Sequence, residues 1–145
     1  MTLVVEIVEH ATDEVRDALN SLVPQLSSRA SVIDDAKLAS IIENPSLTLF
    51  VARESGAILG TLTLAVFPIP SGGIAMIEDV VVDELARGLG AGEALVTAAI
   101  ARAASLGARE VDLTSRPSRK AANALYQKIG FVQRETNVYR YFIEN

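Results

Sequence analysis

The hexapeptide Arg87-Gly88-Leu89-Gly90-Ala91-Gly92 carries the clearest chemical signal in the sequence. It lies between an apolar run that predicts a strand and an alanine-rich run that predicts a helix. A helix N-terminus presents unpaired backbone N–H groups and a partial positive charge, and glycines let an anion approach them closely. Arg87 adds a cation. The hexapeptide therefore predicts a site for a phosphate-bearing ligand.

Other interpretations of these glycines are weaker or incomplete. A P-loop requires a lysine followed by serine or threonine, which is missing here. A dinucleotide fingerprint requires a third glycine, but that position holds Glu93 counted from Gly88 and Leu95 counted from Gly90. Asp112 follows at a suitable distance, so the match is partial. A tight turn whose glycines serve only packing is the structural alternative.

Two carboxylates are adjacent inside an apolar strand-like run, residues 74–82. Side-chain alternation predicts that Glu78 and Asp79 point to opposite faces of the sheet. Because an unpaired buried charge is costly, at least one of them must reach a partner or a wet cleft. Acid–base catalysis is one role for this pair. The structural alternative is a salt bridge from Glu78 to Arg116 or Arg119.

Tyr126 lies on a predicted amphipathic helix, residues 118–129. From the pattern alone the phenol either packs against the core or serves as a proton donor. The rest of the composition restricts the chemistry: the chain has no cysteine and one histidine, His10. Thiol nucleophiles, disulfides and thiolate zinc sites are excluded, and no metal site is predicted. A surface or capping role is expected for His10.

The charge and hydropathy of the chain exclude several classes of partner. The 145 residues have a formal net charge of −5 and contain no long basic stripe, so we expect no nucleic-acid partner. No apolar run is long enough to span a membrane, and the N-terminus does not resemble a signal peptide. We therefore expect a cytoplasmic protein with no membrane partner.

The elements that must position these residues follow from periodicity and turn signals. The predicted fold class is α/β, or more narrowly an α+β mixed sheet, in a single domain spanning 1–145. The element order is β-α-α-β-β-β-α-β-α-β-β. Strands are expected at 1–9, 46–54, 57–67, 74–82, 108–114, 131–135 and 138–143, and helices at 12–27, 34–43, 88–106 and 118–129.

Three segments together resemble the GNAT-type acyl-CoA N-acyltransferases. They are the RxxGxG pattern that begins at Arg87, the strand at residues 77–83, and the segment NALYQKIGF at 123–131. The strand is similar to that of glucosamine-6-phosphate N-acetyltransferases. The order of elements also matches, so the resemblance covers the whole chain and implies the fold of this family.

The resemblance implies a role for each of these residues, with acetyl-CoA as cofactor. Tyr126 is implied as the general acid at the thiolate, and Glu78 or Asp79 as the base that deprotonates the acceptor. The cofactor-binding residues implied are the backbone of Val80, Val81 and Val82 for pantetheine, Arg87, Gly88, Leu89, Gly90, Ala91 and Gly92 for the pyrophosphate, and Asn123 and Tyr126 beside the thioester end.

The sequence departs from the family pattern at one position. Many relatives have an asparagine seven residues before the tyrosine, where this chain has Arg119. Asn123 either replaces it or only makes a hydrogen bond on its own helix. The polar cluster at 115–120 either meets the 3′-phosphate of CoA or an anionic acceptor, or forms a solvated helix start.

The sequence as a whole predicts an N-acetyltransferase that moves an acetyl group to a primary amine of a small molecule in a direct ternary complex. A non-catalytic acyl-CoA-binding or regulatory module is the alternative, as is a protein N-terminal or lysine acetyltransferase. The acceptor stays open, because Asp34, Asp35 and Glu43 favour a cationic amine whereas Arg116 and Arg119 favour an anionic one. A homodimer is implied by the resemblance, through residues 131–143.

Overall fold

The computed structural model describes residues 2–144, which divide between residues 114 and 115 into two compact units. The elements run in the order β1 (Leu3–Ile7), α1 (Asp13–Leu26), α2 (Asp35–Glu43), β2 (Leu47–Glu54), β3 (Ala57–Ile69), β4 (Gly72–Val82), the 3₁₀ turn η1 (Glu84–Ala86), α3 (Ala91–Ser105), β5 (Glu110–Asp112) and α4 (Lys120–Ile129). The first unit contains all of these except α4.

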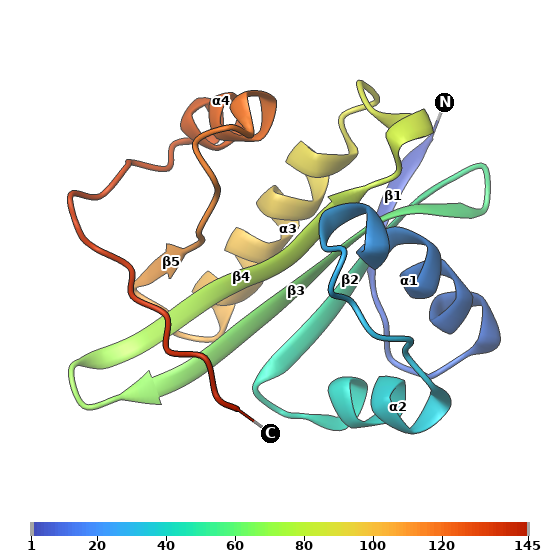
Figure 1. Cartoon of the computed structure of the whole chain (residues 1–145), viewed down its shortest axis with the longest axis horizontal. Helices are drawn as coiled ribbons and strands as arrows, with labels where there is room; N and C mark the ends of the chain where they lie inside the picture. The colour runs from blue at the N-terminus through green and yellow to red at the C-terminus, as the bar shows by residue number, and fades with distance from the viewer. Residues whose placement is uncertain (1, 145) are drawn as a thin grey trace. The chain divides into compact units, whose positions relative to one another are not determined.

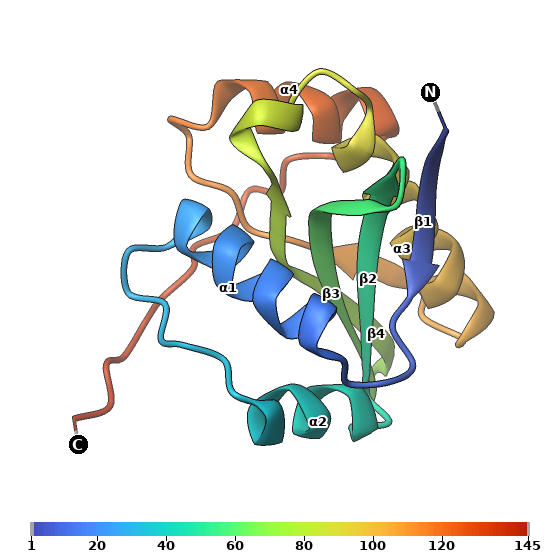
Figure 2. The same cartoon turned by 90° about the vertical axis from the view of Figure 1, so that its right-hand side faces the viewer.

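The first unit is a five-stranded mixed sheet in the order β1-β2-β3-β4-β5. The first four strands are antiparallel, and β5 runs parallel to β4. Helix α3 covers one face of the sheet, and α1 and α2 cover the other (Figures 1 and 2). The predicted α/β class with a mixed sheet is confirmed.

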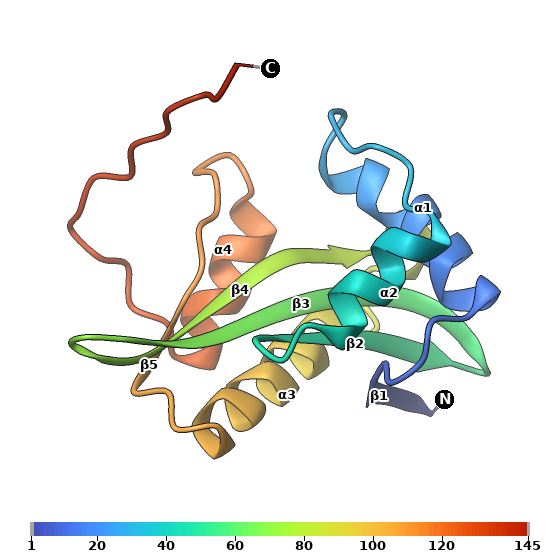
Figure 3. The same ribbon diagram turned by 90° about the horizontal axis from the view of Figure 1, so that it is seen from below.

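Strands β2 and β3 form a hairpin because the residues between them adopt positive φ. Ser55 has φ 51° and Gly56 has φ 83°, which are the angles of the two-residue turn that matches the right-handed twist of the strands. The longer hairpin of β3 and β4 projects beyond the rest of the sheet (Figure 3). Both hairpins fall where the sequence predicts them.

A hydrophobic cluster beneath α1 and α2 holds these helices on the sheet. Its members are aliphatic side chains from α1, the α1–α2 loop, α2 and β2: Val15, Leu19, Ile33, Leu38 and Leu49. Thr12 caps α1 through Val15 N at 3.2 Å, and Asp34 caps α2 through Lys37 N at 2.8 Å. These caps satisfy N–H groups that a helix start otherwise leaves unpaired.

Arg53 on β2 ties the start of α1 to the β1–β2 edge of the sheet. Its guanidinium bonds the Glu14 carboxylate at 2.7 Å and the Glu6 carboxylate at 2.5 Å. The hydrogen bond to Arg53 lowers the pKa of Glu14 below its ordinary value of 4.5. The charge network therefore favours the folded state while Glu14 is ionised.

The second unit differs from the prediction at its C-terminal end. Residues 131–135 and 138–143 were expected to be strands, but residues 131–144 form neither helix nor strand. The apolar side chains of this segment are exposed: Val132, Val138, Tyr139, Tyr141, Phe142 and Ile143. A composition rich in β-branched and aromatic residues shows that a segment suits a sheet, but a strand forms only where another backbone pairs with it.

Candidate active site

A β-bulge in β4 sets the geometry of the two predicted catalytic carboxylates. The register between β3 and β4 shifts, so that Thr63 pairs with Glu78 whereas Thr61 pairs with Val81. Asp79 has φ 50°, in the left-handed region that a non-glycine residue seldom adopts. The register therefore does not fix the face on which Asp79 lies, and the predicted alternation of Glu78 and Asp79 stays a prediction; both side chains are exposed.

The face on which Glu78 lies follows from its strand partner. Glu78 pairs with Thr63, which pairs in turn with Leu49. Leu49 belongs to the cluster beneath α1 and α2. Because paired residues share a face of a sheet, Glu78 lies on the α1–α2 face. Ile77 lies on the opposite face, which α3 covers, because it pairs with Leu64.

The edge of β4 beyond the bulge is open on the side of β5. Strand β5 pairs with β4 only from Ile74 to Met76. Asp83 N donates to Leu59 O at 2.8 Å, so Asp83 and, by alternation, Val81 direct their backbone groups toward β3. The N–H and C=O of Val82 then point away from β3, toward the open edge. An extended ligand has backbone groups to pair with at this edge.

The chain after β4 folds back as a short 3₁₀ turn and a glycine loop. Asp83 accepts a hydrogen bond from Leu85 N at 3.0 Å, and the side chain of Gln25 on α1 accepts one from Glu84 N at 3.1 Å. Gly88 and Gly90 have φ 89° and 85°, where glycine is favoured because it has no Cβ. No other atom lies within 4 Å of a Cβ built at either glycine, so the loop surface is open.

Helix α3 begins at this loop without a side-chain cap. Gly90 is its N-cap, and a glycine has no side chain that could accept from the first N–H groups. The N–H groups of Ala91, Gly92 and Glu93 have no carbonyl four residues earlier within the helix, since Ala94 is the first to bond back, to Gly90 O at 3.0 Å. With the exposed Arg87 beside it, this helix start has the donors and the charge for a pyrophosphate.

In the second unit, Tyr126 on α4 packs against the ring of Phe131. The two ring centroids are 5.9 Å apart and the rings meet edge to face. Burial raises the pKa of the Tyr126 phenol above its ordinary value of 10, and the positive charge and hydrogen bond of Arg119 oppose part of the rise. The phenol is therefore protonated at neutral pH, which is the form a proton donor requires.

Asn123 and Ser115 in the second unit bear on the departure from the family pattern. Asn123 Nδ2 donates to Arg116 O at 3.0 Å, so its amide nitrogen braces the turn that precedes α4. This bond reaches the segment before α4 rather than the helix itself, and a role of Asn123 at the cofactor stays a prediction. Ser115 Oγ is buried and makes no hydrogen bond in the described chain. An orphaned hydroxyl of this kind fits a polar ligand group.

The acidic residues considered for selection of a cationic acceptor already have other partners. Asp34 caps α2, and Asp35 pairs with Arg16 at 2.8 Å. Glu43 lies at the other end of α2, where it lines a separate cavity.

Sequence reasoning also missed Gln25, because its contact with Glu84 joins residues far apart in the chain and no local pattern marks it. In residues 2–144 no helix is long and apolar enough to cross a membrane.

Comparison with known proteins identifies the family of this arrangement. Residues 11–131 match the model of the acetyltransferase (GNAT) family. The chain belongs to the GNAT acetyltransferase family. It is an acyl-CoA-dependent N-acyltransferase by that membership, and its family uses acetyl-CoA. The matched residues include the bulge, the glycine loop and Tyr126. A comparison with curated proteins gave no match.

Solved structures share the GNAT fold over nearly the whole chain. A candidate acetyltransferase from Agrobacterium tumefaciens is 29% identical with a TM-score of 0.81, covering 98% of this chain and 100% of its own. Glucosamine-6-phosphate N-acetyltransferase from Arabidopsis thaliana is 23% identical with a TM-score of 0.82, covering 99% and 100%. AAC(6')-Iy, solved with a bisubstrate analogue that contains CoA, is 19% identical with a TM-score of 0.79, covering 99% of both chains.

Proposed function

We propose that this GNAT protein transfers the acetyl group of acetyl-CoA to a primary amine of a small molecule, by direct attack within a ternary complex. The observation that carries the proposal is the uncapped start of α3 behind an open glycine loop with positive φ at Gly88 and Gly90. That arrangement suits a pyrophosphate. The absence of cysteine from the sequence excludes a route through an acyl-cysteine.

The first unit supplies the residues for cofactor and acceptor. Bound acetyl-CoA contributes an acetyl thioester that an amine can attack. Ala91, Gly92 and the neighbouring N–H groups hold the pyrophosphate, and Arg87 adds charge. The outward backbone groups of Val82, with Val80 beside the bulge, hold the pantetheine arm as a strand neighbour would, whereas the backbone groups of Val81 are directed toward β3.

The acid and the base divide the proton transfers of the reaction. As the acceptor nitrogen bonds to the acetyl carbon and the carbon–sulfur bond breaks, one proton leaves the nitrogen and one reaches the sulfur. Glu78 accepts the first through a water molecule, with Asp79 as the alternative base. Tyr126 donates the second. Its raised pKa supports this role, because the phenol stays protonated until a developing thiolate takes its proton.

A tyrosine substitution tests the proposal directly. Tyr126→Phe removes one oxygen and keeps the ring contact with Phe131, so the protein should fold and bind CoA while turnover falls about 10²–10⁴-fold. Tyr139→Phe is the matched control, because Tyr139 is 87% exposed and turnover should not change. Turnover would be followed as free thiol released from acetyl-CoA across a panel of amines, amino sugars and peptides.

The outcomes of that panel separate the alternatives. Wild-type turnover on small amines supports the proposal, and turnover on peptides alone overturns the small-molecule acceptor. CoA binding without turnover on any amine would identify a binding module instead. We also propose a cytoplasmic homodimer, as the family resemblance implies. Light scattering at several protein concentrations tests the dimer, and a single monomer mass at all of them rejects it.

A further inference from the structure

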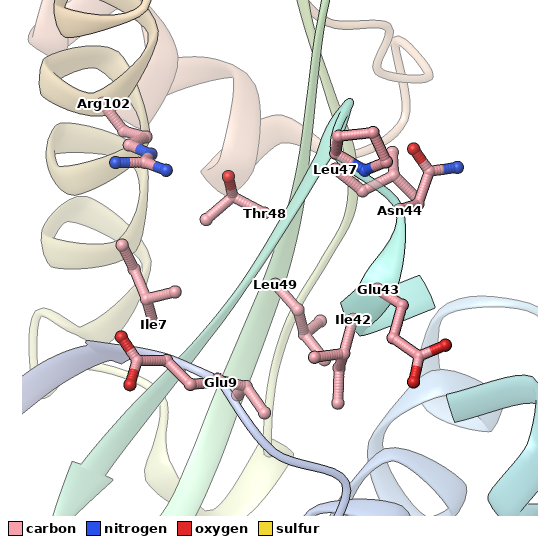
Figure 4. A pocket seen from close by; sticks show the side chains of 11 residues that line it. Ile7, Glu9, Ile42, Glu43, Asn44, Leu47, Thr48, Leu49 and Arg102 are labelled. Atoms are coloured by element: carbon pink, nitrogen blue, oxygen red, sulfur yellow. The ribbon is translucent and has the colours of Figure 1, made fainter. Parts of the chain in front are cut away.

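A cavity lies in the first unit, at the edge of the sheet far from β4 and β5. Its volume is about 340 Å³, and its walls come from the end of β1, the end of α2, the start of β2 and the last turn of α3. Figure 4 shows the side chains around it. Arg102 on α3 lies twelve residues after the Gly90 N-cap, which is about 18 Å along a helix. The cavity is therefore separate from the pyrophosphate site.

The cavity exists because β1 ends before β2 does. The last paired residues are Ile7 and Phe50, and the last bond between the strands runs from Val8 N to Leu49 O at 2.8 Å. The chain then turns away toward α1. Leu47 and Thr48 consequently begin β2 with no β1 residue beside them. The notch left at this edge is polar on the side that faces α3.

Three polar side chains converge on that side of the notch. Thr48 pairs with Leu64, and Ile7 pairs with Phe50, which places all four on the face that α3 covers. Thr48 is only 8% exposed, and its side chain lies between Ile7 and Arg102 (Figure 4). Arg102 extends from α3 toward the same opening, and Glu9 lies beside Ile7 (Figure 4).

The two charges of the notch are not neutralised by each other. In the described chain neither Arg102 nor Glu9 takes part in a salt bridge, although both line one cavity. A guanidinium and a carboxylate separated by open space are complementary to a molecule that carries both charges. The Thr48 hydroxyl adds a donor near Arg102, and the Ile7 side chain adds an apolar wall.

We propose that this notch binds a small zwitterion, a free α-amino acid with an aliphatic side chain. Arg102 and Thr48 would bind the carboxylate, Glu9 the ammonium group, and Ile7 the side chain. A cavity of this volume holds a molecule of roughly ten non-hydrogen atoms, if each takes about the 30 Å³ of a water molecule. The site does not depend on acetyl transfer, so its test stands apart from that of the proposed function.

Three ligands of nearly the same shape distinguish the two charge contacts. L-leucine carries both charges, L-leucinamide only the ammonium group, and 4-methylpentanoate only the carboxylate. Each would be titrated into the ¹⁵N-labelled protein without acetyl-CoA, and amide shifts followed by NMR. We expect L-leucine to shift Ile7, Thr48 and Arg102, with affinity at least tenfold above either analogue, since each charge-assisted contact is worth about 1.5–3 kcal/mol.

Variants show whether the binding uses these residues rather than the acceptor site, where an amine could also bind. Arg102→Gln should weaken L-leucine binding at least tenfold and leave L-leucinamide binding unchanged. Glu9→Gln should also weaken L-leucine binding at least tenfold, but should leave 4-methylpentanoate binding unchanged. Arg134→Gln and Glu110→Gln, at exposed positions outside the cavity, are the controls and should have no effect. Equal binding of all three ligands, unaffected binding in Arg102→Gln, or shifts confined to the residues around Glu78 would overturn the proposal.

Discussion

A pair of substitutions at Gly90 tests whether an anion binds at the start of α3. Gly90→Asn and Gly90→Asp introduce side chains of nearly the same shape that differ by one negative charge. Both residue types tolerate positive φ better than other non-glycine residues, and a Cβ at Gly90 meets no atom within 4 Å. Both variants should therefore fold, with a small and similar loss from backbone strain.

The added charge should have opposite effects on the free and the bound protein. Without ligand, the free energy of unfolding of Gly90→Asp should exceed that of Gly90→Asn by about 0.3–1 kcal/mol, because the added negative charge lies near the positive end of α3. With CoA, the carboxylate lies near the pyrophosphate. Two unit charges about 5 Å apart at an effective dielectric constant of about 20 repel by about 3 kcal/mol, and screening by salt reduces this. We expect CoA affinity to be ten- to a hundredfold weaker in Gly90→Asp than in Gly90→Asn.

Thermal unfolding reports both effects in one assay. CoA at a hundred times its wild-type Kd adds about 2.7 kcal/mol, or roughly 5–10 °C in a chain of this size. A hundredfold loss of affinity leaves about 1 °C. Pantetheine, which lacks the phosphates, is the control ligand and should distinguish the variants little. Equal CoA shifts for Gly90→Asn and Gly90→Asp would refute the placement of the anion at this helix start.

Three further predictions concern stability. Leu38→Ala should cost about 2–5 kcal/mol in urea unfolding, since Leu38 is fully buried in the cluster beneath α2; a loss under 1 kcal/mol would contradict that packing. Glu14→Gln should lower Tm at pH 7 but not at pH 2–3. A carboxylate whose pKa is lowered in the folded state stabilises the fold at pH values above its unfolded-state pKa, and this stabilisation is lost as pH falls through its folded-state pKa. A difference in Tm that does not depend on pH would speak against the ion pair with Arg53. The raised pKa of Tyr126 predicts a loss of stability at high pH, because the stabilising effect of a raised pKa is full below the unfolded value of about 10 and is lost as pH rises through the folded value. Between about pH 9 and 11.5, Tyr126→Phe should therefore lose less stability than wild type. Equal losses of stability in the two proteins would argue against burial of the phenol.

The sequence predicted the elements whose signals are local. The predicted helix starts at residues 12 and 34 coincide with the caps Thr12 and Asp34, since each side chain accepts from a backbone N–H group nearby. The Ser55-Gly56 turn follows from the positive φ that a two-residue hairpin requires. The start of α3 follows in the same way from its glycines. Each cap, turn or helix start depends on about five consecutive residues or fewer, so the local sequence pattern is sufficient to predict it.

Features that depend on distant residues could not be predicted in this way. The bulge at Asp79 arises from the register between β3 and β4, and no periodicity in β4 alone marks it. The notch at Thr48 depends on where β1 stops pairing with β2. Residues 131–143 are rich in β-branched and aromatic side chains, as strands are, but that composition does not supply the second backbone that a strand needs. The site residues of the GNAT resemblance stay predictions until the substitutions above are made.

The bulge in β4 also bears on which insertions and deletions this chain can accept. Before it, odd-numbered residues such as Ile77 point to the α3 side; after it, odd-numbered Val81 shares a face with Thr61, on the opposite side. The two halves of the strand are thus one residue out of phase. Loss of a single residue at 79 or 80 would remove the bulge, while 81 and 82 would keep their present faces opposite Thr61 and Gly60. A lineage could therefore lose one of these residues without disturbing the packing beyond the bulge, but it would lose the exposed position with positive φ that Asp79 occupies.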